Sequence, residues 1–324
     1  MKVLYRHITP SVSALLRSTP SFRQARMNRY IRPVLLLMLV AALAGTAFAG
    51  DVTEVVLFSG GISPANNYPR YYTDMARAWD ITTDLFGVNN VYVLWANGVN
   101  GDGIGVADES DGSNSDWSFV PAGHILSATA GNLQTTLEDT VPEAGGSDYS
   151  FLFYSFDHGG PVTDNSITNV ELNGWAGSNI TNTQFATWAG SLTATEQLYD
   201  FNECYSKGMT QPLLDDSSGN VFVMWAASYC SFSNGFSNAF LNAIDPNVAD
   251  LTTTNAIGAY AVQNDPYGPN GPIATRNMED PGYGGDNFNI LTNQAVPEPA
   301  SLAYMLLGIG AIGIFRPRRV TEQS

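Results

Sequence analysis

Two stretches of the chain decide its fold: residues 149–160, YSFLFYSFDHGG, and residues 196–204, EQLYDFNEC. The first begins with a continuous, mostly apolar run, which is typical of a strand buried on both faces of a parallel sheet, and we expect a second strand at Glu196–Phe201. The first stretch ends at His158 and the second at Cys204. In open α/β sheets, ligands bind beyond the carboxyl ends of the strands. We therefore expect His158 and Cys204 to face each other across a crevice there.

Similar apolar runs recur along the chain, at Val55–Ser59, Val91–Trp95 and Val221–Ala226. Amphipathic stretches suited to helices lie between the runs, at residues 71–86, 131–139, 183–190 and 235–244. Strands that alternate with helices predict an α/β fold whose sheet is covered on both faces.

The two ends of the chain carry signals. Residues 27–49 combine a basic start, an apolar run and the small-x-small cleavage pattern Ala47-Phe48-Ala49, and so predict a secretory signal peptide. Residues 1–26 are an N-terminal extension to which we assign no fold. We expect the folded domain at residues 50–261. Residues 262–295, rich in Pro, Gly and Asn, are expected to form a surface wrap or a linker.

Residues 296–324 hold Val296-Pro297-Glu298-Pro299, then an apolar stretch, then three arginines. This order resembles the PEP-CTERM tail that an exosortase handles in bacteria. The resemblance implies a secreted or cell-surface protein of a Gram-negative type bacterium, with exosortase and the secretion machinery as partners and with membrane contact only through this tail. A plain C-terminal membrane anchor is the alternative, since the arginines would hold the end of the apolar stretch in the cytoplasm.

The charge of the expected domain limits the partners that it could bind. Residues 50–295 contain 28 acidic residues and only four basic ones, which are Arg70, Arg77, Lys207 and Arg276. Such a domain is not expected to bind nucleic acid or anionic lipid by electrostatics. Within it, residues 97–116 are dense in carboxylates and glycines. A calcium loop and a solvated acidic loop both fit that composition, and the spacing does not match an EF-hand.

His158 and Cys204 are the residue types that thiol chemistry needs. A thiolate is a strong nucleophile, and a nearby imidazole takes the thiol proton and later protonates the leaving amine. The backbone N–H groups of Gly159 and Cys204 could hold the oxyanion. In the alternative interpretation both residues lie at the edge of the core, and Cys204 forms a disulfide with Cys230. We interpret His124, in a loop, as structural.

The same residues resemble the legumain (asparaginyl endopeptidase) family of the caspase-like clan. Residues 151–159, FLFYSFDHG, are similar to the family's strand that ends in Asp-His-Gly, and residues 202–206, NECYS, to the strand that ends at its nucleophilic Cys. Residues 55–61 resemble its first strand and glycine turn. Asn67-Tyr68-Pro69-Arg70 resembles its Asn-Tyr-Arg segment, with Pro69 as an extra residue.

The resemblance implies a caspase-like αβα sandwich with a mostly parallel sheet of about six strands. It implies a cysteine endopeptidase without metal or cofactor, in which Cys204 attacks a peptide or protein substrate and His158 transfers the proton. Asn67 would orient His158. The substrate pocket would be lined by Arg70, Asn202 and Glu203.

Arg70 favours cleavage after Asn or Asp, whereas Glu203 would favour a basic residue. Two other functions stay open. One is a catalytically inactive matrix or surface relative, with a Cys204–Cys230 disulfide or with its pocket closed by Tyr205 or Lys207. The other is a transpeptidase, because an amine can also resolve an acyl-enzyme.

Overall fold

The computed structural model describes residues 52–98, 109–164, 166–229, 235–269 and 279–290, which fall within one unit, Gly50–Glu298. The predicted signal peptide, the predicted sorting tail and Cys230 lie outside the described residues, as do residues 99–108 of the acidic segment 97–116. The structure therefore does not test the predictions that concern these residues.

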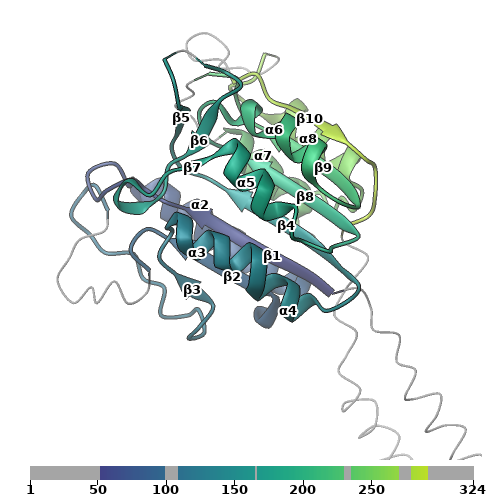
Figure 1. Cartoon of the computed structure of the whole chain (residues 1–324), viewed down its shortest axis with the longest axis horizontal. Helices are drawn as coiled ribbons and strands as arrows, with labels where there is room; N and C mark the ends of the chain where they lie inside the picture. The colour runs from purple at the N-terminus through teal and green to yellow at the C-terminus, as the bar shows by residue number, and fades with distance from the viewer. Residues whose placement is uncertain (1–51, 99–108, 165, 230–234, 270–278, 291–324) are drawn as a thin grey trace, which may run out of the picture. The chain divides into compact units, whose positions relative to one another are not determined.

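The described residues form a seven-stranded sheet in the order β10-β9-β8-β4-β1-β2-β3 (Figure 1). All neighbouring strands are parallel except β10, which runs antiparallel to β9. The predicted α/β class with a mostly parallel sheet is thereby confirmed, with one strand more than expected. The strands are β1 (Val52–Ser59), β2 (Val91–Trp95), β3 (Ile125–Leu126), β4 (Tyr149–Ser155), β8 (Glu196–Phe201), β9 (Asn220–Trp225) and β10 (Gly282–Gly285).

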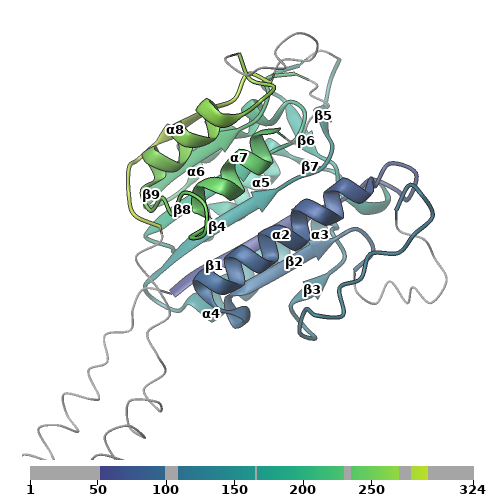
Figure 2. The same ribbon diagram turned by 180° about the vertical axis from the view of Figure 1, so that it is seen from behind.

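Helices cover both faces of this sheet, so the domain has three layers (Figures 1 and 2). One face carries the long helices α2 (Pro69–Phe86), α7 (Gly235–Ile244) and α8 (Thr254–Asn264). The other carries α3 (Ala130–Thr135), α4 (Val141–Gly145), α5 (Asn182–Ala189) and α6 (Thr210–Asp216). A π-helical turn, Thr136–Thr140, joins α3 to α4 just before Pro142, whose nitrogen has no hydrogen to donate to the preceding turn.

The alternation of side chains along the strands explains why both faces need cover. In β1, Val55 and Leu57 point into the core beneath α2 and α7, whereas Val56 and Phe58 point into the core beneath α3 and α5. All four are buried. Burial on both faces favours the continuous apolar runs that identified the strands in the sequence.

Part of the segment 262–295, which was expected to be a surface wrap or a linker, forms regular secondary structure. Helix α8 continues through Asn264, and β10 adds a strand to the sheet edge by pairing with β9. Among the residues that the structure describes, no helix is long and apolar enough to cross a membrane.

A second, smaller sheet follows His158 directly. Its antiparallel strands are β5 (Gly159–Pro161), β6 (Val170–Leu172) and β7 (Ile180–Thr181). Figure 1 shows this sheet beyond one end of the main sheet. The main sheet ends there at β4 and β8, whose register pairs Ser155 with Phe201. The residues after both strands therefore leave the sheet at the same level, beneath the small sheet.

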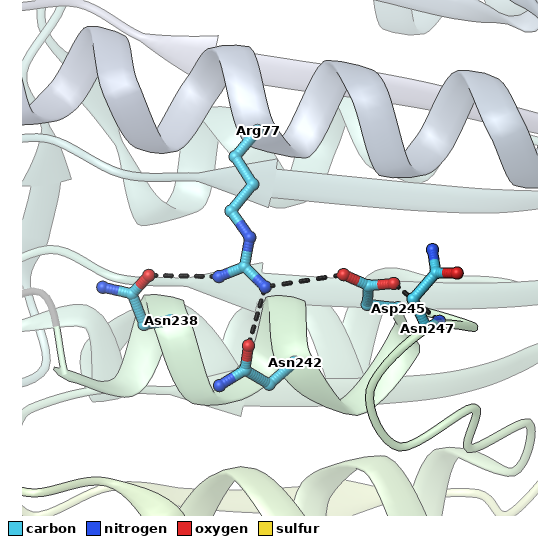
Figure 3. A network of polar contacts seen from close by, with 5 residues as sticks. All are labelled: Arg77, Asn238, Asn242, Asp245 and Asn247. Atoms are coloured by element: carbon cyan, nitrogen blue, oxygen red, sulfur yellow. Dashed lines mark hydrogen bonds and ion pairs between the residues drawn. The ribbon is translucent and has the colours of Figure 1, made fainter.

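Arg77 ties two helices together on the α2 face (Figure 3). Its guanidinium donates to the side-chain oxygens of Asn238 at 3.2 Å and Asn242 at 2.7 Å, both on α7. It also lies 3.7 Å from the Asp245 carboxylate, just after that helix. One of the few basic residues of the domain thus holds the middle of α2 against α7.

Candidate functional site

The imidazole of His158 is held by two oxygen atoms from the segment that leads into α2. Its Nε2 lies 3.0 Å from the Asn66 backbone carbonyl oxygen and 3.3 Å from the Tyr71 hydroxyl. A carbonyl oxygen can only accept a hydrogen bond, so Nε2 carries the proton. The other ring nitrogen, Nδ1, is then the basic atom of the neutral ring.

The Asp157 carboxylate stabilises the turn that carries His158. Its carboxylate accepts hydrogen bonds from the Ser59 hydroxyl at 3.0 Å, from the Gly61 backbone N–H and from the His158 backbone N–H at 2.6 Å. Gly61 has a φ of +65°, and a Cβ there would lie 2.7 Å from the Asn67 side chain, so only glycine fits this turn. Asp157 therefore locks the end of β1 to the turn that carries His158.

Cys204 is half-buried in the loop that follows β8. The next residue, Tyr205, has a left-handed backbone with a φ of +63°, which is strained for a tyrosine. The loop is fastened to the residues after β9, because the Tyr205 N–H donates to the Tyr229 carbonyl at 2.9 Å. The Ser206 hydroxyl accepts from the N–H groups of Ala226 and Ala227, both at 3.1 Å.

The turn that carries His158 and the loop that carries Cys204 lie against each other. A Cβ added at Gly159 would stand 2.4 Å from the Cys204 backbone oxygen and 2.9 Å from the Glu203 Cβ. Any side chain at position 159 would therefore push the two segments apart. The fold thus brings the backbones of Gly159 and Cys204 together at the ends of two neighbouring strands, and the facing of the His158 and Cys204 side chains across a crevice stays a prediction.

Burial and charge shape the acid–base properties of this site. Burial, and then the positive charge of Arg70, lower the pKa of His158, although the bond to Asn66 opposes this. Burial raises the pKa of Asp157 to about 7, against the three hydrogen bonds that it accepts. Burial and the Asp157 charge raise the pKa of Tyr71, whereas the hydrogen bond from Arg70 and the Arg70 charge oppose this rise.

Arg70 lies on the solvent side of the site. Its guanidinium carbon is 5.0 Å from the ring centroids of both Tyr68 and Tyr71, and its Nη2 donates to the Tyr71 hydroxyl at 3.2 Å. Asp74, one turn further along α2, is buried and accepts a hydrogen bond from Ser237 at 3.0 Å. Arg70 is therefore exposed beside His158 and held by two aromatic rings.

The other two predicted pocket residues do not lie with Arg70. Asn202 is 5% exposed and Glu203 is 2% exposed. The Asn202 amide donates to the Ser155 carbonyl at 2.9 Å and to Asp200 at 2.8 Å, inside the sheet. Strand β5 covers Glu203, as the contact at Gly159 shows. The expectation that these side chains face a substrate is corrected by their burial beneath the small sheet.

Asn67 is fully buried and packs its side chain against Gly61. Its backbone oxygen accepts the Ser110 N–H at 2.7 Å. The oxygen that lies 3.0 Å from His158 Nε2 is instead the backbone carbonyl oxygen of the preceding residue, Asn66. An orienting role for the Asn67 side chain stays a prediction.

A cavity of about 430 Å³ opens beside the Cys204 loop. Its walls come from the residues after Cys204, from the end of β9 and from the turn between β5 and β6, and they include Lys207, Trp225 and Ile167. The Lys207 ammonium lies 5.8 Å from the Trp225 ring centroid. This cavity is large enough for a substrate side chain.

Within the described part of the chain, no three His, Cys, Asp or Glu side chains are grouped so that they could hold a metal ion. The described carboxylates of the acidic segment bond to nearby serines: Glu109 and Asp111 accept hydrogen bonds from the Ser113 hydroxyl, and Asp116 accepts one from the Ser118 N–H. His124 has a structural setting, since its ring stacks on Tyr92 and its Nδ1 lies 3.0 Å from the Val91 carbonyl oxygen.

Sequence reasoning missed two members of the site. Asn66 contributes a backbone carbonyl, which any residue type could supply, so no sequence pattern reports it. Tyr71 was placed only within a predicted helix. The sole signal for it was its position next to Arg70 in the segment that resembles the family's Asn-Tyr-Arg motif.

Comparison with protein families matches residues 295–319 to the PEP-CTERM protein-sorting motif. A search of curated proteins finds no match for the chain. The motif confirms the predicted sorting tail and the predicted localisation, and it implies recognition by an exosortase and the secretion machinery. The chain is therefore an exported protein of the cell surface that carries a PEP-CTERM sorting motif at residues 295–319.

Proposed function

We propose that this exported protein is a cysteine endopeptidase of the legumain-like kind, with a caspase-like fold, Cys204 as nucleophile and His158 as general base. The observation that carries the proposal is the contact between two loops at the ends of neighbouring parallel strands. One loop presents an imidazole whose Nε2 is tied to Asn66, and the other presents the thiol. The three-layer architecture and the motif resemblance support the same reading.

The chemistry follows from these groups. Nδ1 of His158 takes the thiol proton of Cys204, and the sulfur attacks the peptide carbonyl carbon. The tetrahedral intermediate collapses with cleavage of the C–N bond, and the imidazolium gives its proton to the leaving amine. Water, deprotonated by His158, then cleaves the thioester. The N–H groups of Gly159 and Cys204 are the candidates to hold the oxyanion.

Substrate preference is proposed to depend on Arg70. Glu203 is buried, so a pocket that selects a basic residue through this carboxylate lacks support. Arg70 is exposed next to His158, and its planar fork of donors suits a carboxylate or an amide oxygen. Asp or Asn before the cleaved bond is therefore favoured.

An electrophilic peptide tests this assignment. The purified, reduced protein is treated with matched peptide chloromethyl ketones that carry Asp, Asn, Leu or Arg at the reactive residue. We expect covalent labelling at Cys204, fastest with Asp or Asn, and a loss of that preference in Arg70→Ala. Peptide mapping by mass spectrometry gives the labelled residue and the rate.

The matched control is Arg77→Ala, which removes the same charge from the same helix but away from His158. Labelling that ignores the peptide sequence, or that occurs only at Cys230, would count against the peptidase and favour the inactive surface relative.

A further inference from the structure

We propose that Tyr71 is a positioning residue of this site, which keeps the proton of neutral His158 on Nε2 and steadies the imidazolium that forms when Nδ1 takes the Cys204 proton. This inference rests on the proposed function and extends it to a residue that no motif identifies. Four contacts of Tyr71 support this role.

Tyr71 is fixed more tightly than a surface tyrosine. It is 2% exposed and lies in the first turn of α2, which begins at Pro69. Its ring meets the rings of His158 at 5.4 Å and Phe156 at 5.1 Å, both nearly perpendicular. Edge-to-face packing of this kind leaves the ring little freedom to turn. The hydroxyl is therefore held at one place relative to His158.

The hydroxyl oxygen is oriented by Arg70. The Arg70 Nη2 donates to it at 3.2 Å, which uses one of its acceptor positions. The oxygen keeps a second acceptor position, and Nε2 of His158 lies 3.3 Å away. Because Asn66 requires the hydrogen to be on Nε2, the Tyr71 oxygen shares that hydrogen as a second acceptor.

This arrangement matters most when the ring becomes charged. Hydrogen bonds from a charged donor are roughly twice as strong as neutral ones. Burial and Arg70 both disfavour the imidazolium. Two oxygens on Nε2 offset these effects, and they leave Nδ1 as the atom that exchanges protons with the thiol.

The ionisable groups near His158 come from three segments, and of these groups Arg70 lowers the pKa of His158. The entry to α2 contributes Arg70, Tyr68 and Tyr71, the turn after β4 contributes Asp157, and the loop after β8 contributes Cys204. Of these groups, Tyr71 brings its hydroxyl oxygen to 3.3 Å from Nε2 of the His158 ring.

Tyr71→Phe tests the proposal because it removes the hydroxyl and retains the ring. In the purified full-length protein we expect the His158 pKa, followed by NMR, to fall below that of the wild type. We also expect the alkylation of Cys204 by iodoacetamide at neutral pH to slow by roughly 10-fold or more, as for the loss of one hydrogen bond to a charged group. Mass spectrometry of the Cys204 peptide gives the rate.

Tyr72→Phe is the matched control. It makes the same change one residue later on α2, where the hydroxyl donates to the Asp116 carbonyl at 2.6 Å. An unchanged His158 pKa in Tyr71→Phe relative to Tyr72→Phe would overturn the proposal.

His158→Gln tests the proposed catalytic pairing independently of the proposed role of Tyr71. If that variant alkylates Cys204 as fast as the wild type, the catalytic pairing fails. The NMR titration of His158 in Tyr71→Phe still decides whether Tyr71 positions the ring.

Discussion

His158→Gln is expected to lower peptide turnover by roughly 10²- to 10⁴-fold, the range that a general acid–base group contributes. Glutamine can donate to the Asn66 carbonyl as His158 does, so the turn after β4 can keep its hydrogen bond. It cannot take the proton of Cys204. At neutral pH only a few per cent of an unactivated thiol is ionised, and the reaction would depend on that fraction.

The control for this variant is His124→Gln, the other histidine within residues 50–295. His124 stacks on Tyr92 at the far edge of the sheet, so its replacement should leave turnover near the wild-type value. Measuring turnover from pH 5 to pH 9 adds a second readout. The His158→Gln profile should rise with pH as hydroxide takes over the role of the base. A parallel fall in both variants would mean that the histidine acts through stability alone.

The second prediction with a large effect is a decrease in folding stability as the pH becomes alkaline. Burial raises the pKa of Glu54 and of Asp200 to about 8, and that of Asp157 to about 7. These carboxyls hold their protons when folded and lose them at lower pH when unfolded. Their contribution to stability is therefore complete below the unfolded pKa, near 4, and is lost as pH rises through 7 to 8. We expect urea unfolding to give a clearly lower free energy of unfolding at pH 9 than at pH 5.

Asp200→Asn isolates one of these groups. Asp200 is fully buried in β8 and accepts a hydrogen bond from Asn202 at 2.8 Å, which an asparagine oxygen can also accept. The variant should reduce the loss between pH 5 and pH 9 by roughly 2 to 5 kcal/mol, since each unit of pKa shift corresponds to about 1.4 kcal/mol.

Asp215→Asn is the control for charge, because Asp215 is exposed on α6. It should leave the loss between the two pH values as large as in the wild type. Equal losses in the wild type and in Asp200→Asn would show that Asp200 is already ionised in the folded protein.

Much of the main sheet could be predicted from the sequence because its strands are buried on both faces. Strands β2 and β8 and helix α7 have the predicted bounds, and α2 begins two residues earlier than expected. Strands β5 to β7 were missed because they have only two or three residues each and lie among glycines and asparagines. Strand β10, Gly282–Gly285, was missed because its sequence GYGG has almost no side chains to reveal a pattern.

The same limit explains the site. His158 and Cys204 were found because their side chains follow recognisable strands. The family resemblance implies a substrate pocket lined by Asn202 and Glu203, yet the unpredicted small sheet covers Glu203. The contact from Asn66 comes from the backbone, and that from Tyr71 depends on how α2 docks. Both are tertiary features, and residue type alone does not encode them.

Peptide turnover by the reduced wild-type protein, compared with Cys204→Ala, tests the central claim most directly. A fluorogenic library varied at the residue before the cleaved bond supplies the substrates, and Cys230→Ala is the matched control. The account predicts turnover that is abolished in Cys204→Ala, retained in Cys230→Ala and highest after Asp or Asn. Turnover that survives in Cys204→Ala, or its absence from a folded wild-type protein at every pH tested, would contradict it.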